Sequence, residues 1–205
     1  MLNVGFNPNT SVQKNNSTSA KSKPRQYNPS FGDSLLIIKP EVFHRSANIL
    51  EKIKNKGFEI VEVSVRKLTS KEAKAHYKEL ELNSRKMLQE GNDFLVNVHK
   101  KVIKNMLKGN VTTAIIKGDD AVVAEFKNFV GATSYKKRDP KSLRGQIEKE
   151  MIQEWTKQGK NVDEIESLRD AYTFTHASDT NLFPGTNIKN YDYEIANLYP
   201  NHPIK

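Results

Sequence analysis

From residue 34 onward, apolar positions recur with two different periods that alternate along the chain. The run Ser34–Lys39 is apolar almost without interruption until Pro40 closes it, which predicts a short buried strand. In Phe58–Leu68 apolar residues alternate with charged ones, as expected of a half-buried strand. Two further short runs, Val111–Ile116 and Tyr172–Thr175, are also predicted to be strands.

Between these strands, apolar residues recur at helical spacing. Ala47–Lys56 predicts an amphipathic helix, and Thr69 or Ser70 is positioned to cap the next helix. A long polar helical stretch is expected over 81–108, and a shorter helix over Ala121–Val130. The resulting order, β-α-β-α-α-β-α, predicts an α+β sandwich in which one layer of helices covers an antiparallel sheet.

Residues 145–170 add a helical segment before the last predicted strand. Gln146–Trp155 predicts a surface helix that docks through three apolar residues spaced four apart, Ile147, Met151 and Trp155. A second short helix is expected over Val162–Leu168, after a break at Gly159. The strand Tyr172–Thr175 then leads directly into His176.

The first 32 residues differ from the rest in composition. They are rich in Asn, Ser, Lys and Pro, show no period, and carry four basic side chains and no acidic one. Such a segment cannot bury enough apolar surface to offset its ordering entropy. We therefore expect a disordered basic tail over 1–32 and one folded domain over 33–205.

The charge of the chain suits an anionic partner. Its 33 basic and 24 acidic side chains give a net charge of +9. Removing the four basic residues of the tail leaves 29 against 24, so the domain itself carries +5. This balance fits nucleotide phosphates, nucleic acid or an anionic surface, and it is equally compatible with an ordinary solvated surface.

Several classes of site and location are excluded by composition. There is no cysteine, so disulfides and thiolate chemistry are ruled out, and the five histidines form no H-E-x-x-H pair for a dedicated metal site. The longest apolar runs are far too short to span a membrane, and the first residues lack the apolar core of a secretory signal. A cytoplasmic protein without membrane contact is the expectation.

Candidate chemistry is concentrated at His176, which follows the last predicted strand and precedes a Ser-Asp turn. A histidine at a strand end is a nucleophile or general base that works near neutral pH. Lys39 ends the first predicted strand, and Arg144 lies in a Leu-Arg-Gly triplet. One histidine with separated cations is what phosphoryl transfer needs, although each residue alone is also compatible with a structural role.

Four motifs in order resemble those of the nucleoside diphosphate kinase family. Ile38-Lys39-Pro40-Glu41 with Arg45 is similar to the family's K-P-D…R opening, and His76-Tyr77 follows the second strand. Gly131-Ala132-Thr133…Leu143-Arg144-Gly145 resembles G-x-T…[IL]-R-G. His176-Ala177-Ser178-Asp179 with Glu194-Ile195 resembles H-G-S-D…E-I. The resemblance covers about Ser34 to Pro200, and none of the motifs is specific alone.

The resemblance implies a ferredoxin-like βαββαβ core and a ping-pong transfer of a γ-phosphoryl group from a nucleoside triphosphate to a diphosphate through His176. The implied catalytic residues are His176, Lys39, Glu194, Ser178 and Tyr77, with Glu194 and Ser178 orienting the histidine. The implied nucleotide-binding residues are Lys39, Lys127, Thr133, Arg144 and Thr173. Magnesium is expected on the nucleotide phosphates, with no metal held by the protein itself.

Two positions depart from the family pattern. Lys127 stands where the family has a phosphate-binding arginine, and Thr173 stands where it has an asparagine. Together with the helical insertion at 145–170, they leave open an alternative: a catalytically inactive nucleotide-binding or interaction module of the same fold. The expected partners are nucleoside di- and triphosphates and further copies of the chain. Nucleic acid would bind at most nonspecifically.

Overall fold

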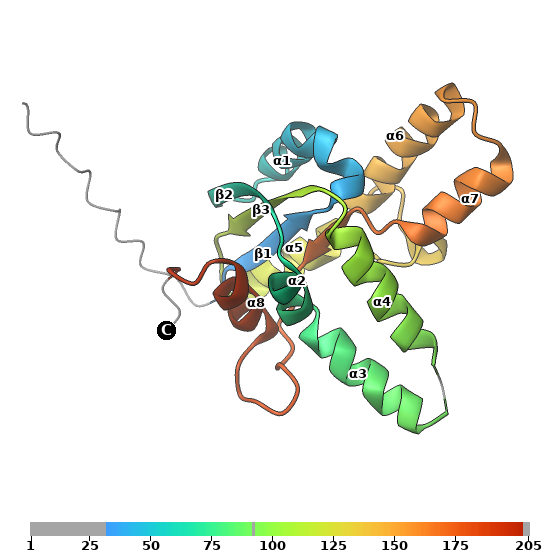
Figure 1. The fold of residues 1–205 in the computed structure, drawn as a ribbon. Coiled ribbons are helices and arrows are strands. Elements are labelled where there is room, and N and C mark those ends of the chain that lie inside the picture. Colours follow the sequence, from blue (N-terminus) through green and yellow to red (C-terminus); the bar gives the residue numbers. More distant parts are fainter. Residues whose placement is uncertain (1–31, 92, 203–205) are drawn as a thin grey trace, which may run out of the picture.

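The computed structural model describes residues 32–91 and 93–202 of the chain (Figure 1). At its centre is a four-stranded sheet in the order β2-β3-β1-β4. The strands are β1 (Ser34–Ile38), β2 (Ile60–Lys67), β3 (Asn110–Ile116) and β4 (Thr175–Ala177). Every neighbouring pair is antiparallel, as expected of a ferredoxin-like sheet. Apart from Gly32, the predicted tail lies outside the described residues, as do the last three residues of the predicted domain.

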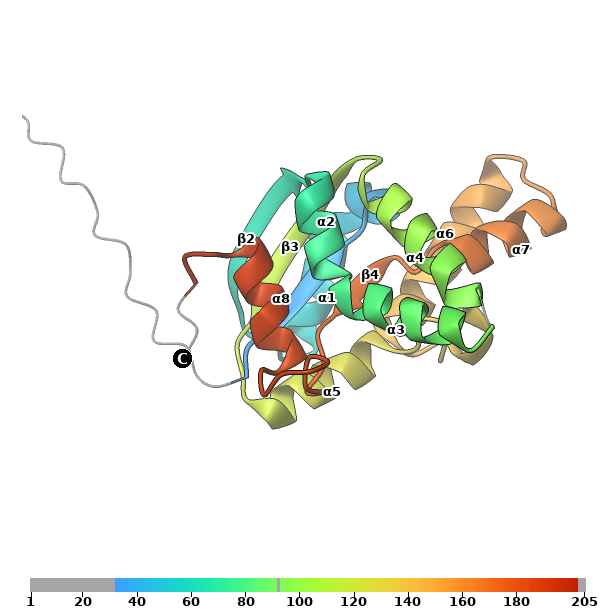
Figure 2. The same ribbon diagram turned by 60° about the horizontal axis from the view of Figure 1, so that its bottom comes forward.

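Helices cover both faces of this sheet, so the prediction of a single helical layer was wrong (Figures 1 and 2). One face packs against α1 (Ser46–Asn55), α5 (Asp120–Val130) and α6 (Leu143–Lys157). The other packs against α2 (Ser70–His76), α4 (Phe94–Met106) and α8 (Asn190–Leu198). The remaining helical segments are η1 (Pro40–Arg45), α3 (Lys78–Gln89), η2 (Tyr135–Lys137) and α7 (Val162–Ala171).

The composition of β1 explains why both faces are covered. Its four apolar residues, Leu35 to Ile38, are each fully buried although successive side chains point to opposite faces. Leu36 and Ile38 belong to the core with α1, α5 and α6, whereas Leu35 and Ile37 belong to the core with α2, α4 and α8. An unbroken apolar run is the pattern of a strand buried on two sides, and not of one with a solvated face.

The long helical stretch expected over 81–108 is two helices. α3 and α4 lie side by side as a hairpin, with a turn at Gly91, whose φ of +80° lies in the region that favours glycine (Figure 1). Helical spacing alone does not reveal such a reversal, because apolar positions continue on either side of it. α8 was not predicted, although Tyr191, Ile195 and Leu198 have the spacing of a helix that packs through one face.

The last strand begins later than predicted. Phe174 has a φ of +60°, which interrupts the predicted strand, and β4 therefore starts at Thr175. The Phe174 ring is fully buried in the core between α6 and the sheet. Its amide donates to the Glu41 carboxylate at 3.2 Å, and its carbonyl accepts from the Lys39 amide at 2.9 Å. These contacts support a conformation that costs energy in a residue with a side chain.

The helix predicted over Gln146–Trp155 is confirmed as part of α6, and its apolar stripe is buried as expected. Ser142 caps α6 by accepting from the Gly145 amide at 3.2 Å. Arg45, just before α1, donates to two carboxylates of α6, Glu150 and Glu154, at 2.8 Å each. Within the described residues, no helix is both long and apolar enough to cross a membrane.

Candidate active site

The sheet brings Lys39 and His176 together from opposite ends of the sequence. His176 pairs with Ile37 across β1 and β4, and Lys39 follows two residues after Ile37. The Lys39 ammonium donates to the hydroxyl of Thr173. Lys39 is 7% exposed, so its charge is held in a largely dry environment at the end of β1.

Glu194, on α8, lies behind the histidine. Its Oε2 is 2.9 Å from His176 Nε2, and the same oxygen accepts a hydrogen bond from the Ser178 hydroxyl. Ser178 Oγ also accepts from the Leu35 amide at 3.2 Å, which fixes its position against β1. α8 can place Glu194 here because Ile195 and Leu198 of the same helix are buried against the sheet.

Two aromatic side chains at the end of α2 pack around this pair. The ring of His76 lies 4.5 Å from that of His176, centroid to centroid, at an interplanar angle of 84°. The Tyr77 ring is 6.1 Å from the His176 ring, and the Lys39 Nζ lies 5.6 Å from the Tyr77 centroid. Tyr77 therefore lies beside Lys39 as the resemblance implies, and His76 also contacts the histidine.

Arg144 is held by three backbone carbonyls. Its Nε donates to Thr173 at 3.1 Å, one Nη donates to Thr175 at 2.7 Å, and the other donates to Gly131. The guanidinium therefore bridges the loop after α5 and the segment leading into β4. Arg144 also lines the pocket next to His176, so its charge acts there in addition to this structural role.

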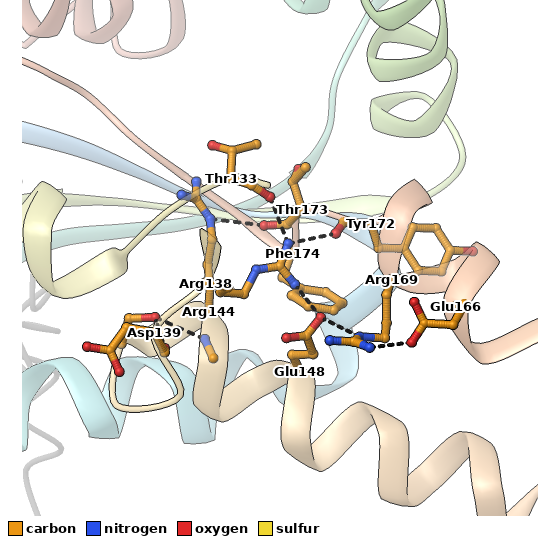
Figure 3. A network of polar contacts seen from close by, with 12 residues as sticks. Thr133, Arg138, Asp139, Arg144, Glu148, Glu166, Arg169, Tyr172, Thr173 and Phe174 are labelled. Carbon is orange, nitrogen blue, oxygen red and sulfur yellow. Dashed lines mark hydrogen bonds and ion pairs between the residues drawn. The ribbon is translucent and has the colours of Figure 1, made fainter. Parts of the chain in front are cut away.

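A second arginine, which the sequence analysis did not identify, reinforces the same bridge (Figure 3). Arg138 donates to the carbonyls of Thr133 at 2.7 Å and Tyr172 at 3.3 Å. Its other terminal nitrogen donates to Glu148 at 2.9 Å, and the Arg138 side chain is fully buried. The Glu148 oxygen also accepts from Arg169 of α7 at 3.1 Å.

Sequence reasoning missed these three residues because their partners lie 10 and 21 positions apart. One signal was available. Glu148 is four residues after Arg144 and three before Met151, so it falls on the buried side of an amphipathic helix. A charge there requires a buried partner, although its identity cannot be read from the sequence.

Two pockets meet at Thr133. The histidine pocket, about 260 Å³, is lined by His176, Lys127, Arg144 and Thr133, among other residues. The outer pocket, about 530 Å³, lies between α4 on one side and η2 with the end of α7 on the other, and Lys39 and Thr173 line its inner end. The volume of the outer pocket is in the range of small-molecule sites.

Lys127 reaches the histidine pocket from α5 and forms an ion pair with Asp179. A wider surface hollow of about 810 Å³ shares Lys127 and Gly131 with this pocket but is not lined by His176. The predicted site residues are thus brought together: His176, Lys127, Thr133 and Arg144 around the inner pocket, and Lys39 and Thr173 at its junction with the outer one.

The electrostatic setting favours a neutral histidine. Burial lowers the pKa of His176 well below its usual range, and the Lys39 and Arg144 charges lower it further. Burial also raises the pKa of the Glu194 carboxyl, an effect that the Ser178 hydrogen bond opposes. The pKa of Lys39 falls to about 8 mainly because the ammonium is desolvated; the Glu41 charge opposes this fall, and the Arg144 charge adds to it.

One cluster in the described residues has the composition of a metal site. The possible ligand atoms of His76, His176 and Glu194 lie within 4.8 Å of one another. Two imidazole nitrogens and one carboxylate oxygen do not suit Mg²⁺, which prefers oxygen ligands. The neighbouring charges of Lys39 and Arg144 also oppose a cation there. These residues therefore do not fit a resident magnesium ion.

Comparison with solved structures defines the class of the fold. It is similar to an NDP kinase from Pyrobaculum aerophilum, with a TM-score of 0.58 and 22% identity over 83% of this chain and 96% of that one. It is also similar to the Aquifex aeolicus nucleoside diphosphate kinase, with a TM-score of 0.53 and 20% identity over the same shares. These likenesses support a ferredoxin-like α+β fold.

The sequence gives a narrower assignment. The family model for nucleoside diphosphate kinase matches residues 32–182, and the chain belongs to that family. Among curated relatives, nucleoside diphosphate kinases of Methanocaldococcus jannaschii and Methanococcus maripaludis are each 25% identical over 114 residues. Those alignments cover 55% of this chain and 71% and 75% of the relatives, respectively. Nucleotide phosphotransfer is the general function that this family supports.

Proposed function

We propose that the protein transfers the γ-phosphoryl group of a nucleoside triphosphate to a nucleoside diphosphate through a phosphohistidine at His176. The observation that carries the proposal is the placement of His176. Its Nε2 is 2.9 Å from Glu194, while the ring lines a pocket with Lys127 and Arg144. A nucleophile backed by a carboxylate and faced by cations is the arrangement that phosphoryl transfer requires.

In the first half-reaction, the lone pair of His176 Nδ1 forms a bond to the γ-phosphorus. The bond from that phosphorus to the bridging oxygen breaks, and its electron pair leaves with the diphosphate. The Nε2 proton stays on the ring throughout, and the N–H donates a hydrogen bond to the Glu194 carboxylate, which fixes the tautomer and stabilises the positive charge that develops on the imidazole. The second half-reaction reverses these steps with another diphosphate as acceptor.

The cations stabilise the negative charge that spreads over the phosphoryl oxygens in the transition state. We assign Lys39, Lys127 and Arg144 to this role, with the Thr133 hydroxyl as a further donor. Tyr77 packs against Lys39, and Thr173 accepts from it, so both position the ammonium. Magnesium would arrive on the nucleotide phosphates, because the protein's own donor set does not suit it.

The nucleoside would occupy the outer pocket, which continues from Thr133 toward α4. Apolar side chains of α4, including Phe94, Leu95 and Val98, line one side of this pocket. A flat base can pack against such a surface, while Thr173 and Lys39 lie at the end nearer the phosphates.

The alternative is a catalytically inactive nucleotide-binding or interaction module. A single experiment separates the two. We expect wild-type protein incubated with γ-labelled ATP and Mg²⁺ to form an acid-labile phosphoenzyme that unlabelled diphosphate then discharges. His176→Ala should take up no label, whereas His44→Ala, on an exposed histidine, should behave as wild type. Nucleotide binding without labelling of the wild type would favour the inactive module.

Self-association is part of the same proposal. In the described sheet β2 is an edge strand, and its Val63 and Val65 are 48% and 57% exposed. An exposed apolar edge strand is suited to pairing with another copy of the chain. Light scattering of the purified protein tests this, and a monomeric mass at micromolar concentration would contradict it.

A further inference from the structure

The helical segment that precedes β4 lies next to the outer pocket. The end of α7 contributes Arg169 and Asp170 to its lining, opposite the α4 residues Phe94 and Lys101. Lys101 and Asp170 approach each other at 4.0 Å across the two helices. α7 therefore forms part of the boundary of the pocket, although it belongs to the helical segment predicted as an insertion.

Arg169 is oriented by contacts on three sides. Its Nε donates to Glu148 at 3.1 Å, and one terminal nitrogen donates to Glu166 (Figure 3). The guanidinium carbon lies 4.8 Å from the centroid of the Tyr135 ring, so the two groups face each other. Among the described residues, the second terminal nitrogen of Arg169 has no hydrogen-bond partner, and the side chain keeps 26% of its surface exposed.

The same contacts connect Arg169 to the inner site. Glu148 accepts from both Arg169 and Arg138, and Arg138 donates to the carbonyls of Thr133 and Tyr172. Thr133 lines both pockets. One buried carboxylate therefore connects α7, through Arg138, to the loop that carries Thr133, and Figure 3 shows these contacts.

We propose that α7 is a wall of the nucleotide pocket, that Arg169 contacts the nucleoside part of a bound nucleotide, and that Glu148 is its positioning residue. This rests on the proposed function for its ligand. Arg169 lines the outer pocket together with Asp170, which faces Lys101 of α4, and the apolar α4 residues that would pack on the base line the same pocket. We therefore place Arg169 on the side of the base and sugar, away from the histidine pocket, which it does not line. A planar guanidinium can stack on a base and also donate hydrogen bonds to it.

The experiment compares the binding of two probes, Mg-ADP and inorganic tripolyphosphate, by calorimetry. In Arg169→Gln we expect the Kd for ADP to rise about ten-fold, because a charge-assisted contact is lost, while the Kd for tripolyphosphate changes less than about two-fold. In Arg169→Lys the Kd for ADP should remain raised as in Arg169→Gln, because lysine keeps the charge but lacks the planar guanidinium. Arg85→Gln is the matched control: Arg85 is 69% exposed and pairs with Glu81 on α3.

Three outcomes decide the matter. Selective loss of ADP binding in a variant whose melting temperature matches the control supports the proposal, even if His176 takes no label. An unchanged Kd for ADP in Arg169→Gln overturns it while leaving phosphoryl transfer intact. An equal loss for both probes also overturns it, because Arg169 would then act on the phosphates or on the fold.

Discussion

Glu194 and His176 meet through one hydrogen bond of 2.9 Å between Oε2 and Nε2, and this bond assigns different roles to the two ring nitrogens. Because Nε2 faces the carboxylate, Nδ1 is the nitrogen that is left to react. The Ser178 hydroxyl donates to the same carboxylate oxygen, and this second bond restricts the rotation of the Glu194 carboxylate. The pair thus sets both the tautomer and the orientation of the proposed nucleophile.

Replacing this carboxylate should slow phosphorylation without abolishing it. In Glu194→Gln the amide can still contact Nε2, but the negative charge that stabilises the ring is gone. We expect the rate of phosphoenzyme formation to fall about 10- to 100-fold, the loss that is typical when the hydrogen-bond partner of a metal-bound histidine is replaced. Rapid-quench labelling measures it. Asp192→Asn, on the same helix, is the control, and an equal loss there would contradict a specific role for Glu194.

The dependence of activity on pH follows from the two shifted groups. The lowered pKa of His176 keeps the ring neutral in mild acid, so the acidic limb of the profile should lie well below the usual histidine range. The pKa of Lys39 is about 8, and its charge is lost as pH rises through that value. We therefore expect kcat/KM to hold through mildly acidic pH and to decline above about pH 8. A pH–rate profile with its acidic midpoint near 6.5 would contradict this.

The buried ammonium of Lys39, which we propose for phosphate binding, should lower the stability of the fold. Its pKa of about 8 in the folded protein lies below the 10.5 of an unperturbed lysine, so below pH 8 the fold must hold a desolvated ammonium. Between those two values the unfolded chain binds more protons, and stability rises with pH. At pH 7 the free energy of unfolding of Lys39→Met should therefore exceed that of wild type by up to roughly 3 kcal/mol, and the loss of the contact with Thr173 reduces this gain. Urea unfolding measures the difference.

The control for that prediction is built into the pH dependence. At pH 11 the Lys39 side chain of the wild type is neutral when folded and mostly neutral when unfolded, so it no longer differs in charge from the methionine of the variant. The stability difference between Lys39→Met and wild type should therefore shrink. The variant should also take up no phosphoryl label if Lys39 binds the transferring group. A variant that is less stable than wild type at pH 7 would show that the ammonium is stabilised in place by its neighbours.

Glu148 should contribute more to stability than Glu166, the more exposed carboxylate that pairs with the same arginine, Arg169. In Glu148→Ala the fully buried Arg138 loses its charged partner, which typically costs about 3–5 kcal/mol. Glu166→Ala removes only an i, i+3 pair of a 45% exposed side chain and should cost about 0.5 kcal/mol or less. Urea unfolding at neutral pH compares them, and equal losses would contradict the buried network.

Lys39 and His176, the residues proposed for phosphoryl transfer, stood out in the sequence because each lies beside a local signal. Lys39 directly follows an apolar strand closed by proline, and His176 precedes a Ser-Asp turn. Their meeting in space required only the pairing of β1 with β4. The Arg138–Glu148–Arg169 network could not be predicted, because it depends on which charges face one another after α6 and α7 have packed.

The second layer of helices could have been predicted from the sequence. The run Leu35–Ile38 is apolar at every position, and this already indicated a strand with no solvated side. The exact start of β4 could not be predicted from the sequence, because the positive φ of Phe174 is unusual for a residue that is neither glycine nor asparagine. Tertiary contacts from Glu41 and Lys39 support that conformation.

The shortness of β4 has a consequence for how His176, the proposed nucleophile, is held. β4 spans three residues at the edge of the described sheet and pairs with β1 alone. Short edge strands open most readily in local unfolding, so backbone amides around His176 should exchange hydrogen for deuterium faster than those of β1. A nucleotide that contacts Lys39, Thr173 and Arg144 would bridge this strand to its surroundings. A bound nucleotide would then protect the very segment that carries the proposed nucleophile.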